Sequence, residues 1–317
     1  MRSEAVLREL EPSVGRLLEW HLSVARDWLP HQFVPWSAAR DFDGPLNGSA
    51  WEEAQSPLSR PVQDALIINL LTEDNLPSYH FELASRTGRD GAWGAWIHRW
   101  TAEESRHADV LRAYVHARRA LDPVALEELR MRHVGTGFRS DLPTALHGLA
   151  YVTVQELATH RAHRNVGVSC GDPAGERLMA RIAADENLHM LFYRGLYADA
   201  LRLFPDESLI ALADVVCGFR MPGAGIPGFG ARAMRVAAAG IFNLDVHREH
   251  VVGPLLRALR VMSATGLGAT GRQAQDRLGR HVEWLETQAS RARELYERMN
   301  AGSAAGPLAA RTKETQA

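Results

Sequence analysis

Apolar side chains recur every three or four residues along most of this chain, and strict alternation of apolar and polar positions is rare. That spacing places apolar residues on one face of a helix and therefore predicts an all-α fold. We expect helices at residues 10–28, 60–86, 92–120, 124–133, 141–167, 173–203, 206–219, 229–263 and 270–300.

Proline and glycine interrupt the periodic pattern. Pro30 and Pro35 follow the first expected helix, and residues 220–230 are too rich in glycine and proline to be helical. No shift in composition divides the remainder, so residues 1–300 are expected to form a single domain. The last segment, 301–317, is small, polar and proline-containing, which predicts a disordered C-terminal tail.

Two of the expected helices carry a Glu-x-x-His pair on an apolar stripe. Glu104 and His107 form the first pair, and Glu186 and His189 form the second. Steps of three or four residues connect them to large apolar side chains, which are Trp93, Trp96, Trp100, Leu111 and Tyr114 for the first pair and Met179, Ile182, Tyr193 and Leu196 for the second. Both pairs are therefore predicted to face the protein core.

Each pair is preceded by a further glutamate. Glu73 lies 31 residues before Glu104, and Glu156 lies 30 residues before Glu186. This order is the ligand pattern of a carboxylate-bridged di-iron or di-manganese centre in a helical bundle. We therefore predict a ferritin-like four-helix bundle with additional helices and a di-iron centre in the bundle core.

Charge balance favours metal ions at this position. A buried carboxylate is costly unless it is paired or binds metal, and the stripes carry no matching cations. Two ferrous ions would neutralise four glutamates, and oxygen and imidazole ligands suit iron or manganese. The predicted metal ligands are Glu73, Glu104, His107, Glu156, Glu186 and His189.

Pro77 follows Glu73 at the fourth position, so the Glu73 carbonyl loses its usual helical donor. The pattern allows either a helix end or a kink beside the metal. Four other histidines could compete as ligands. His160 and His163 follow Glu156, but neither lies three residues after it, and we interpret them as packing or surface residues. His247 and His250 are interpreted as structural.

Composition narrows the class of protein. The 317 residues are 46% apolar and carry a net charge of −2, so no basic field indicates nucleic-acid binding. Cys170 and Cys217 cannot form a disulfide framework. The N-terminus lacks the apolar segment of a signal peptide, and no apolar run approaches the roughly 20 residues that span a bilayer. We therefore expect a cytoplasmic protein without a transmembrane segment.

Several segments carry a resemblance to a known family. They are RDWLPHQFVPW (26–36), LTEDNLPSY (71–79), WGAWIHRWTAEESRH (93–107), VQELAT (154–159), DENLH (185–189) and MPGAGIPGF (221–229). Over residues 10–260 the chain resembles the soluble acyl-[acyl-carrier-protein] desaturases of the ferritin-like di-iron class, especially their actinobacterial branch. Ser105 and Leu188 depart from the family pattern, but neither is a predicted ligand.

The resemblance implies an O₂-dependent desaturase, an oxidoreductase of class EC 1.14.19.-, with two Fe²⁺ ions per chain. Such an enzyme introduces a cis double bond into an acyl chain on acyl-carrier protein. By the same resemblance, Thr159 lies beside the oxygen-binding face, and Trp28, Asp185 and His107 form an electron route from the surface to iron. Trp28 can also be a helix-core aromatic residue, and Asp185 can also orient an imidazole.

The expected partners follow from the resemblance alone. They are an acyl-acyl-carrier protein, a ferredoxin-type electron donor, O₂ and a second copy in a homodimer, with the tryptophan-rich segment as a candidate interface. An acidic carrier requires a basic patch on its partner. The arginines that could form this patch can alternatively belong to a solvated helix face. The candidates for the patch are Arg118, Arg119, Arg130, Arg132 and His133.

Three other functions share parts of this pattern. A di-iron oxygenase would hydroxylate or N-oxygenate a carrier-bound or free substrate with the same ligands. An iron-storage or silent relative is disfavoured because nothing indicates a cage and all six ligands are present. A ribonucleotide reductase radical subunit needs a tyrosine near the metal, for which Tyr114 and Tyr193 are candidates. The desaturase-like segments favour the desaturase.

Overall fold

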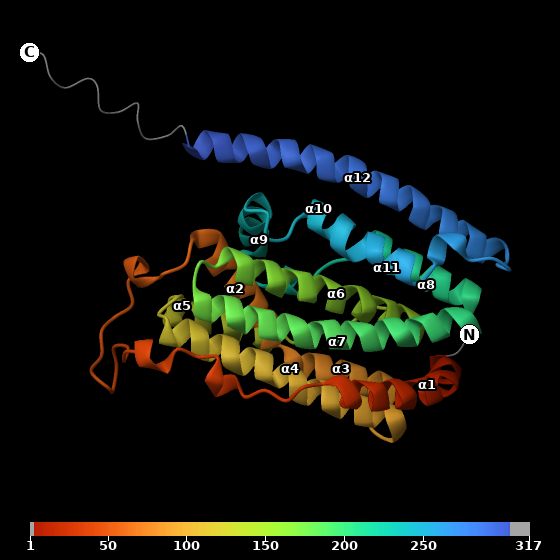
Figure 1. Ribbon diagram of the computed structural model, residues 1–317, viewed down its shortest axis with the longest axis horizontal. Coiled ribbons are helices and arrows are strands. Elements are labelled where there is room, and N and C mark those ends of the chain that lie inside the picture. The colour runs from red at the N-terminus through yellow and green to blue at the C-terminus, as the bar shows by residue number, and fades with distance from the viewer. Residues whose placement is uncertain (1–2, 305–317) are drawn as a thin grey trace, which may run out of the picture.

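The computed structural model describes residues 3–304 and shows an elongated helical protein (Figure 1). Within that range, β structure is limited to one isolated bridge between Phe42 and Ser49. The prediction of an all-α fold is confirmed. None of the helices described combines the length and the apolar character that crossing a bilayer requires.

Long helices alternate with short helical turns along the chain. The α-helices are α1 (Ser3–Val24), α2 (Arg60–Glu73), α3 (Leu76–Thr87), α4 (Gly91–Ala117), α5 (Pro123–Thr136), α6 (Ala145–Ser169), α7 (Pro173–Leu203), α8 (Pro205–Gly218), α9 (Phe229–Ala238), α10 (Leu244–His247), α11 (Gly253–Ala258) and α12 (Ala269–Ala304). A π-helical segment, Arg248–Val252, joins α10 to α11.

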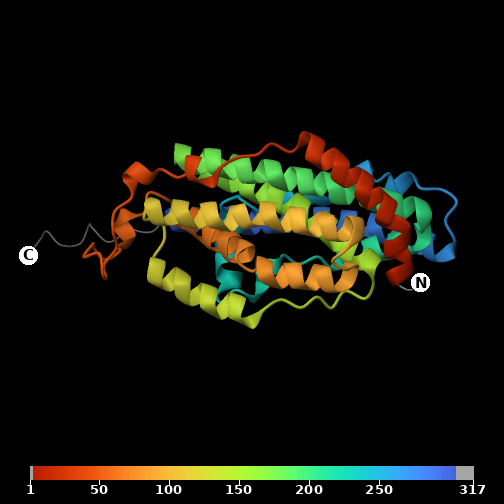
Figure 2. The same ribbon diagram turned by 90° about the horizontal axis from the view of Figure 1, so that it is seen from below.

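Four helices, α2, α4, α6 and α7, form the central bundle. Contacts join α2 to α4, α4 to α7, α7 to α6 and α6 to α2, so the four helices close a ring. Helix α1 packs against α4 and α7, while α8 packs on α6 and α12 forms the outermost layer (Figure 1). Helices α3 and α5 lie on the side of the molecule away from α1 (Figure 2). This is the predicted bundle with additional helices.

The α6–α7 connection shows how local sequence positions two helices of the bundle. Asp172 caps α7, because its side chain accepts a hydrogen bond from Ala174 N at 3.3 Å, and Pro173 occupies the first helical turn. Gly171 has a φ of 66°, which glycine adopts without strain. The resulting turn is short, so α6 and α7 run antiparallel along their length.

The segment predicted as one helix over 60–86 is two helices. Helix α2 ends at Glu73, and Pro77 lies in the first turn of α3. The Asn75 carbonyl accepts a hydrogen bond from Ser78 N at 3.0 Å and starts the new helix. The chain breaks here because Pro77 has no N–H to donate to the Glu73 carbonyl. Of the two alternatives, the helix end is correct.

The prediction of a single helix over 229–263 is wrong. Helix α9 ends at Ala238, and the chain then turns through Gly240, which has a φ of 74°. Asn243 begins the next helix, since its side-chain oxygen accepts a hydrogen bond from Val246 N at 3.0 Å. Apolar residues continue on both sides of this turn, so hydrophobic periodicity does not reveal the break.

The terminal helices also differ from their predicted bounds. Helix α1 covers Ser3–Val24 instead of 10–28, so Trp28 is not part of this helix and lies buried in the loop after it. Helix α12 continues to Ala304, beyond the predicted end at residue 300. The remainder of the predicted tail, 305–317, lies outside the described residues.

The long loop between α1 and α2 is held by Arg119. This arginine is 2% exposed and donates to Gln55 Oε1 and to the Ala50 carbonyl, each at 2.8 Å. Arg119 therefore lies inside the protein and cannot belong to the predicted basic patch. The other predicted members are also engaged or buried: Arg118, Arg130 and Arg132 pair with carboxylates, and His133 is buried.

The tryptophan-rich segment of α4 packs within the chain itself. Trp93, Trp96 and Trp100 are all buried. Trp96 stacks on Phe192 with ring centroids 3.5 Å apart, and Trp93 Nε1 donates to the Leu7 carbonyl at 3.0 Å. Its aromatic rings therefore fill the protein's own core, and the expectation that this segment forms a dimer interface stays a prediction.

Candidate metal centre

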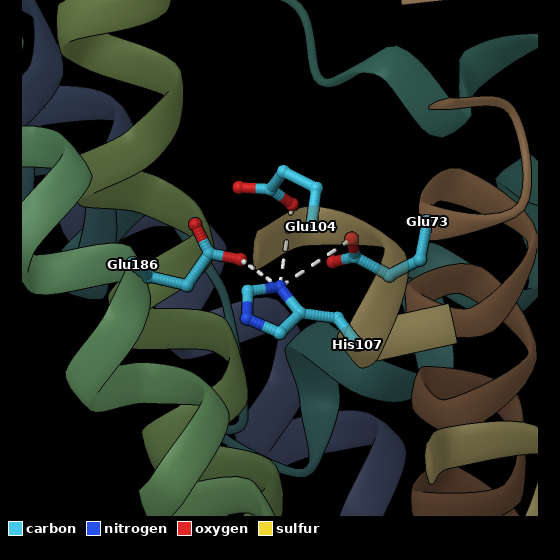
Figure 3. A group of neighbouring side chains, drawn as sticks. All are labelled: Glu73, Glu104, His107 and Glu186. Carbon is cyan, nitrogen blue, oxygen red and sulfur yellow. Dashed lines mark ion pairs between the residues drawn. The ribbon is translucent and has the colours of Figure 1, made fainter. Parts of the chain in front are cut away.

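Six side chains converge inside the bundle, and they are the six predicted metal ligands. Their ligand atoms form two overlapping groups, each within 4.8 Å. The first group contains Glu73, Glu104, His107 and Glu186 (Figure 3), and the second contains Glu104, Glu156, Glu186 and His189. Two glutamates, Glu104 and Glu186, belong to both groups and so lie between two candidate ion positions.

Helical geometry explains why these residues meet. Helix α4 supplies Glu104 and His107 from adjacent turns of one face, and α7 supplies its own pair in the same way. Helix α2 contributes Glu73 from its last turn, and α6 contributes Glu156. None of the six residues is more than 7% exposed. The structure brings the predicted set together, and their role as ligands stays a prediction.

Both histidines point the same ring nitrogen into the cluster. His107 Nδ1 lies 3.2 Å from Glu104 Oε2, and His189 Nδ1 lies 2.8 Å from Glu104 Oε1. Their Nε2 atoms face outward to other carboxylates, at 3.5 Å from Asp185 and 2.9 Å from Glu103. A proton on Nε2 is stabilised by these acids, which leaves the Nδ1 lone pair available to a metal.

Glu103 is a member of the site that the sequence analysis missed. Its Oε2 atom accepts hydrogen bonds from His189 Nε2 at 2.9 Å and from His21 Nε2 at 3.0 Å. Its Oε1 atom accepts a hydrogen bond from Arg99 Nε at 2.7 Å. Burial alone would raise the pKa of Glu103, but hydrogen bonds from the two histidines outweigh burial and lower it. The sequence does contain a signal for Glu103, because an acidic residue directly precedes each Glu-x-x-His pair.

Trp28 and Asp185 contact His107 in the order that the resemblance implied. Trp28 Nε1 donates to Asp185 Oδ2 at 2.6 Å, and the same oxygen lies 3.5 Å from His107 Nε2. Burial would raise the pKa of Asp185, but the bonds from His107 and Trp28 lower it to about 2. The guanidinium groups of Arg106 and Arg181 lie over the Trp28 ring, at 5.2 Å and 5.8 Å.

Two neighbours of the cluster hold carboxylates in place. Thr159 Oγ1 lies one turn after Glu156 and donates to Glu186 Oε2 at 3.0 Å. Trp100 Nε1 donates to Glu156 Oε1 at 3.2 Å. The sequence analysis treated Trp100 only as part of an apolar stripe, although an indole N–H on the ligand face needs a hydrogen-bond partner when buried.

His163 was interpreted as a packing or surface residue, but it is buried and contacts the cluster. Its Nε2 lies 3.1 Å from Glu73 Oε1. Asn69 Nδ2 lies 3.2 Å from His163 Nδ1, so the amide donates to Nδ1 and the ring proton on Nε2 is directed at Glu73. His160 instead donates to the Ala183 carbonyl at 2.7 Å, in keeping with a structural role.

The residues present fit two metal ions. Four inward atoms, His107 Nδ1, His189 Nδ1, Glu104 Oε1 and Glu156 Oε2, have no hydrogen-bond partner of acceptable geometry among the described residues. Burial raises the pKa of Glu156, and the nearby charges of Glu186 and Glu104 raise it further. Divalent cations would relieve this repulsion, and carboxylate oxygens with imidazole nitrogens are a donor set for iron or manganese.

A narrow cavity of about 90 Å³ lies beside the cluster. Its lining includes Glu73, Glu104, Glu186 and Thr159. The remaining lining is mainly apolar and includes Leu76, Leu83, Phe138, Leu142 and Val152. The cavity can therefore place an apolar chain against the carboxylates.

One of the two tyrosines considered for a radical lies far from the cluster. Tyr114 OH donates to Asp172 Oδ2 at 2.8 Å, at the start of α7. Glu186 follows fourteen residues later on the same helix, roughly 21 Å along its axis. Tyr193 lies closer, and its hydroxyl accepts a hydrogen bond from Trp96 Nε1 at 3.0 Å.

Comparisons with known proteins agree with this fold and site. The family described as fatty acid desaturase matches residues 2–305. DesA1 of Mycobacterium tuberculosis, provisionally named an acyl-[acyl-carrier-protein] desaturase, is 42% identical over 289 residues, covering 89% of this chain and 85% of its own. Acyl-[acyl-carrier-protein] desaturase 7 of Oryza sativa, a chloroplast protein, is 33% identical over 86% of this chain and 72% of its own.

A solved structure shows the same architecture. The X-ray structure of DesA2 from Mycobacterium tuberculosis, also provisionally assigned as an acyl-ACP desaturase, superposes with a TM-score of 0.70. The two share 30% sequence identity, over 85% of this chain and 99% of DesA2. The resemblance inferred from the sequence is confirmed. This chain therefore belongs to the fatty acid desaturase family that includes the acyl-[acyl-carrier-protein] desaturases, and it is an oxidoreductase of that family.

Proposed function

We propose that this protein is an O₂-dependent di-iron desaturase that introduces a cis double bond into an acyl chain carried on acyl-carrier protein. The observation that carries the proposal is the convergence of four buried glutamates and two buried histidines beside a narrow, mainly apolar cavity. The names of the relatives supply the substrate class.

In this proposal the two overlapping groups hold two iron ions. One ion takes Glu73 and His107, and the other takes Glu156 and His189. The two glutamates that belong to both groups, Glu104 and Glu186, would be available to both ions. When bound, the iron pair supplies the oxygen chemistry that breaks an unactivated C–H bond, which no amino-acid side chain achieves by acid–base chemistry.

The chain's own residues position the substrate and exclude water. Burying each methylene of an acyl chain in the apolar cavity contributes about 0.8 kcal/mol. Thr159 lines this cavity and holds Glu186 by a hydrogen bond, so it lies where the reacting carbons would approach the carboxylates. Position matters because a displacement of about 1 Å can lower the rate about a hundredfold.

The reaction needs electrons from outside the protein. Removing two hydrogens from the chain and reducing one O₂ to two waters consumes two further electrons and two protons. We propose that a ferredoxin-type donor supplies the electrons through Trp28, Asp185 and His107, which are in contact in that order. Homodimerisation and a cytoplasmic location stay predictions from the sequence.

A second candidate is a di-iron oxygenase acting on a more polar substrate. The observation that favours it is the set of polar side chains in the cavity, namely Tyr79, Tyr151 and Gln155. The Tyr79 hydroxyl is buried and has no hydrogen-bond partner among the described residues. Such a group could bind an oxygen or nitrogen atom of a substrate.

Product analysis tests both candidates. The iron-loaded protein is incubated with O₂, a reductase and ferredoxin, and a panel of acyl-acyl-carrier proteins, and the released acyl groups are analysed by mass spectrometry. Loss of two mass units with a mapped cis double bond supports the desaturase. Gain of sixteen mass units supports the oxygenase. An acyl group that stays unchanged on every carrier substrate contradicts the desaturase and any oxygenase that acts on a carrier-bound chain.

A further inference from the structure

Helix α1 lies outside the four-helix bundle but places one histidine beside the metal centre. The helix packs on α4 and α7, which carry the two Glu-x-x-His pairs. His21 lies in the last turn of α1, and its side chain is fully buried. An additional helix therefore contributes a polar side chain to the surroundings of the centre.

The His21 ring contacts both the acid and the histidine of one half of the centre. Its Nε2 atom lies 3.0 Å from Glu103 Oε2, the same oxygen that lies 2.9 Å from His189 Nε2. The ring also stacks on the His189 ring, with centroids 5.9 Å apart and an angle of 24° between the planes. Trp96 meets the His21 ring edge to face, at 5.2 Å between centroids. These contacts leave the imidazole little freedom to turn.

The bond to Glu103 is the only hydrogen bond that the His21 side chain makes among the described residues. Its Nδ1 atom is buried and has no partner among them. Because an ionised carboxylate only accepts hydrogen bonds, the Nε2 atoms of His21 and His189 both donate to the shared oxygen. Burying the unpaired Nδ1 atom costs stability, a cost that a side chain serving only to fill space would not carry. The bond to Glu103 therefore accounts for an imidazole at this position.

The other half of the centre has a matching donor from the same N-terminal segment, residues 3–32. Trp28, seven residues after His21, donates to Asp185 Oδ2 at 2.6 Å, and that oxygen lies 3.5 Å from His107 Nε2. Each acid also pairs with an arginine four residues before it. These pairs are Arg99 with Glu103 and Arg181 with Asp185. The same arrangement thus occurs twice, with a histidine donor in one half and a tryptophan donor in the other.

We propose that His21 is a positioning residue of the metal centre, which holds Glu103 through its Nε2–H and thereby keeps Nδ1 of His189 directed at the metal. The inference rests on the metal-binding part of the proposed function. Outer partners of a ligand histidine typically change metal affinity tenfold to a hundredfold. Of the two histidines in the centre, Glu103 contacts His189. The effect of His21 should therefore be confined to one of the two ion positions.

Titration of the metal-free protein with Fe²⁺ in the absence of O₂ tests this assignment. Competition with a chromophoric chelator gives the two stepwise dissociation constants. His21→Phe keeps an aromatic ring at this position but removes the donor, and it should weaken one of the two ions about tenfold. His21→Gln places an amide N–H close to the position of Nε2 and should restore both constants to within about twofold of the wild type.

Two single-site backgrounds show which ion depends on His21. Glu73→Ala removes a residue that belongs to the first group alone, and Glu156→Ala removes one that belongs to the second alone. His21→Phe should weaken the remaining ion about tenfold in the Glu73→Ala background and leave it unchanged in the Glu156→Ala background. His31→Phe makes the same change at an exposed histidine of the N-terminal segment and should leave both constants of the wild type unchanged.

Three results would overturn the proposal. The first is wild-type affinity for both ions in His21→Phe. The second is equal weakening in the two backgrounds, which would indicate a general disturbance of the fold. The third is a His21→Gln variant that is folded by circular dichroism but is weakened as much as His21→Phe, since the hydrogen bond would then not be the cause.

The test separates this inference from the proposed function, because binding is measured without substrate, electron donor or O₂. A protein whose metal affinity depends on His21 in this way but that makes no unsaturated product contradicts only the proposed function. A protein that desaturates its substrate while His21→Phe binds both ions as tightly as the wild type contradicts only the role of His21.

Discussion

The Glu103 carboxylate lies 2.9 Å from Nε2 of His189, a residue of the opposite Glu-x-x-His motif. Asp185 makes the reciprocal contact with Nε2 of His107, at 3.5 Å. In both motifs the acidic residue directly precedes the glutamate of the cluster. Each half of the centre therefore orients the histidine of the other half, and the two halves depend on each other.

Glu103→Gln should lower metal affinity about tenfold to a hundredfold. Glutamine can still form a hydrogen bond to His189, but it lacks the negative charge that increases the basicity of the imidazole. Titration of the metal-free protein with ferrous iron measures the change. Glu128→Gln, which alters an exposed glutamate on α5, serves as the control. Equal affinity of the Glu103 variant and the wild type would contradict a positioning role.

The purified wild type is expected to contain two irons per chain, and Glu104→Ala or His189→Ala should abolish this binding. Glu104 belongs to both groups of the centre, so its loss affects both ion positions. Elemental analysis gives the stoichiometry, and circular dichroism verifies that each variant is folded. His250→Ala, at an exposed histidine, should retain both irons. Retention of both irons by the Glu104 variant would count against the assignment.

Removal of the metal should lower the Tm of the wild type by about 5 °C. A ligand present at 100 times its Kd stabilises the folded state by about 2.7 kcal/mol, and chelation removes that contribution. Differential scanning calorimetry with and without a chelator measures the shift. The Glu104→Ala variant should show the same Tm in both conditions, whereas a matching shift in that variant would place the effect elsewhere.

Asp64 connects α2 to α9, and its removal should destabilise the fold. Its side chain is fully buried and lies 2.7 Å from Arg232 Nη1 and 2.5 Å from Arg235 Nε. Burial would raise the pKa of Asp64, but hydrogen bonds from both arginines lower it overall. Asp64→Asn should therefore reduce the free energy of unfolding by about 2 kcal/mol at neutral pH, measured by urea denaturation.

The effect of Asp64→Asn should depend on pH in one direction. A folded-state pKa below the unfolded value of about 3.9 gives stability that is present above that pH and is lost as pH falls through the folded pKa. The difference between variant and wild type should stay constant between about pH 5 and 7 and shrink below about pH 4. A difference that widens on acidification would show that another group is responsible.

Arg86 connects α3 by hydrogen bonds to the loop that lines the cavity. It donates to the Ser140 carbonyl at 2.8 Å and to the Leu142 carbonyl at 3.1 Å. Arg86→Leu should increase amide hydrogen exchange in the loop 137–144 about tenfold while leaving α6 and α7 unchanged. Exchange measured by mass spectrometry checks this. Arg89→Ala, a nearby exposed arginine, is the control, and unchanged loop exchange in the Arg86 variant would contradict the role of these bonds.

Prediction of the fold from sequence succeeded where each signal was local. The long helices α4, α6 and α7 were identified by their periodicity, and Pro77 indicated either a helix end or a kink at Glu73, although 60–86 was expected to be one helix. It failed over 229–263, because a left-handed Gly240 and the Asn243 cap interrupt a pattern that stays apolar. Hydrophobic spacing reports which face is buried, whereas a turn depends on the conformation of individual residues.

The residues around the centre show the same division. Glu104 and His107 were predicted because residues three apart share a helix face. His163 and Glu103 were missed as members of the site, because the residues that they contact are distant in the chain. His163 contacts Glu73, 90 residues away, and Glu103 contacts His189, 86 residues away. Such contacts depend on how the helices are rotated and aligned against each other, which no spacing along one helix contains.

The sequence by itself determined the helical class, the identity of the six residues of the centre and their division into two similar halves, because helical periodicity and residue chemistry are local properties. Only the tertiary structure decided that the acid of one motif orients the histidine of the other, that Arg119 lies inside the protein, and that a narrow, mainly apolar cavity lies beside the cluster. These relationships follow from packing between distant segments, since burial and hydrogen bonding are settled only when the whole chain is folded.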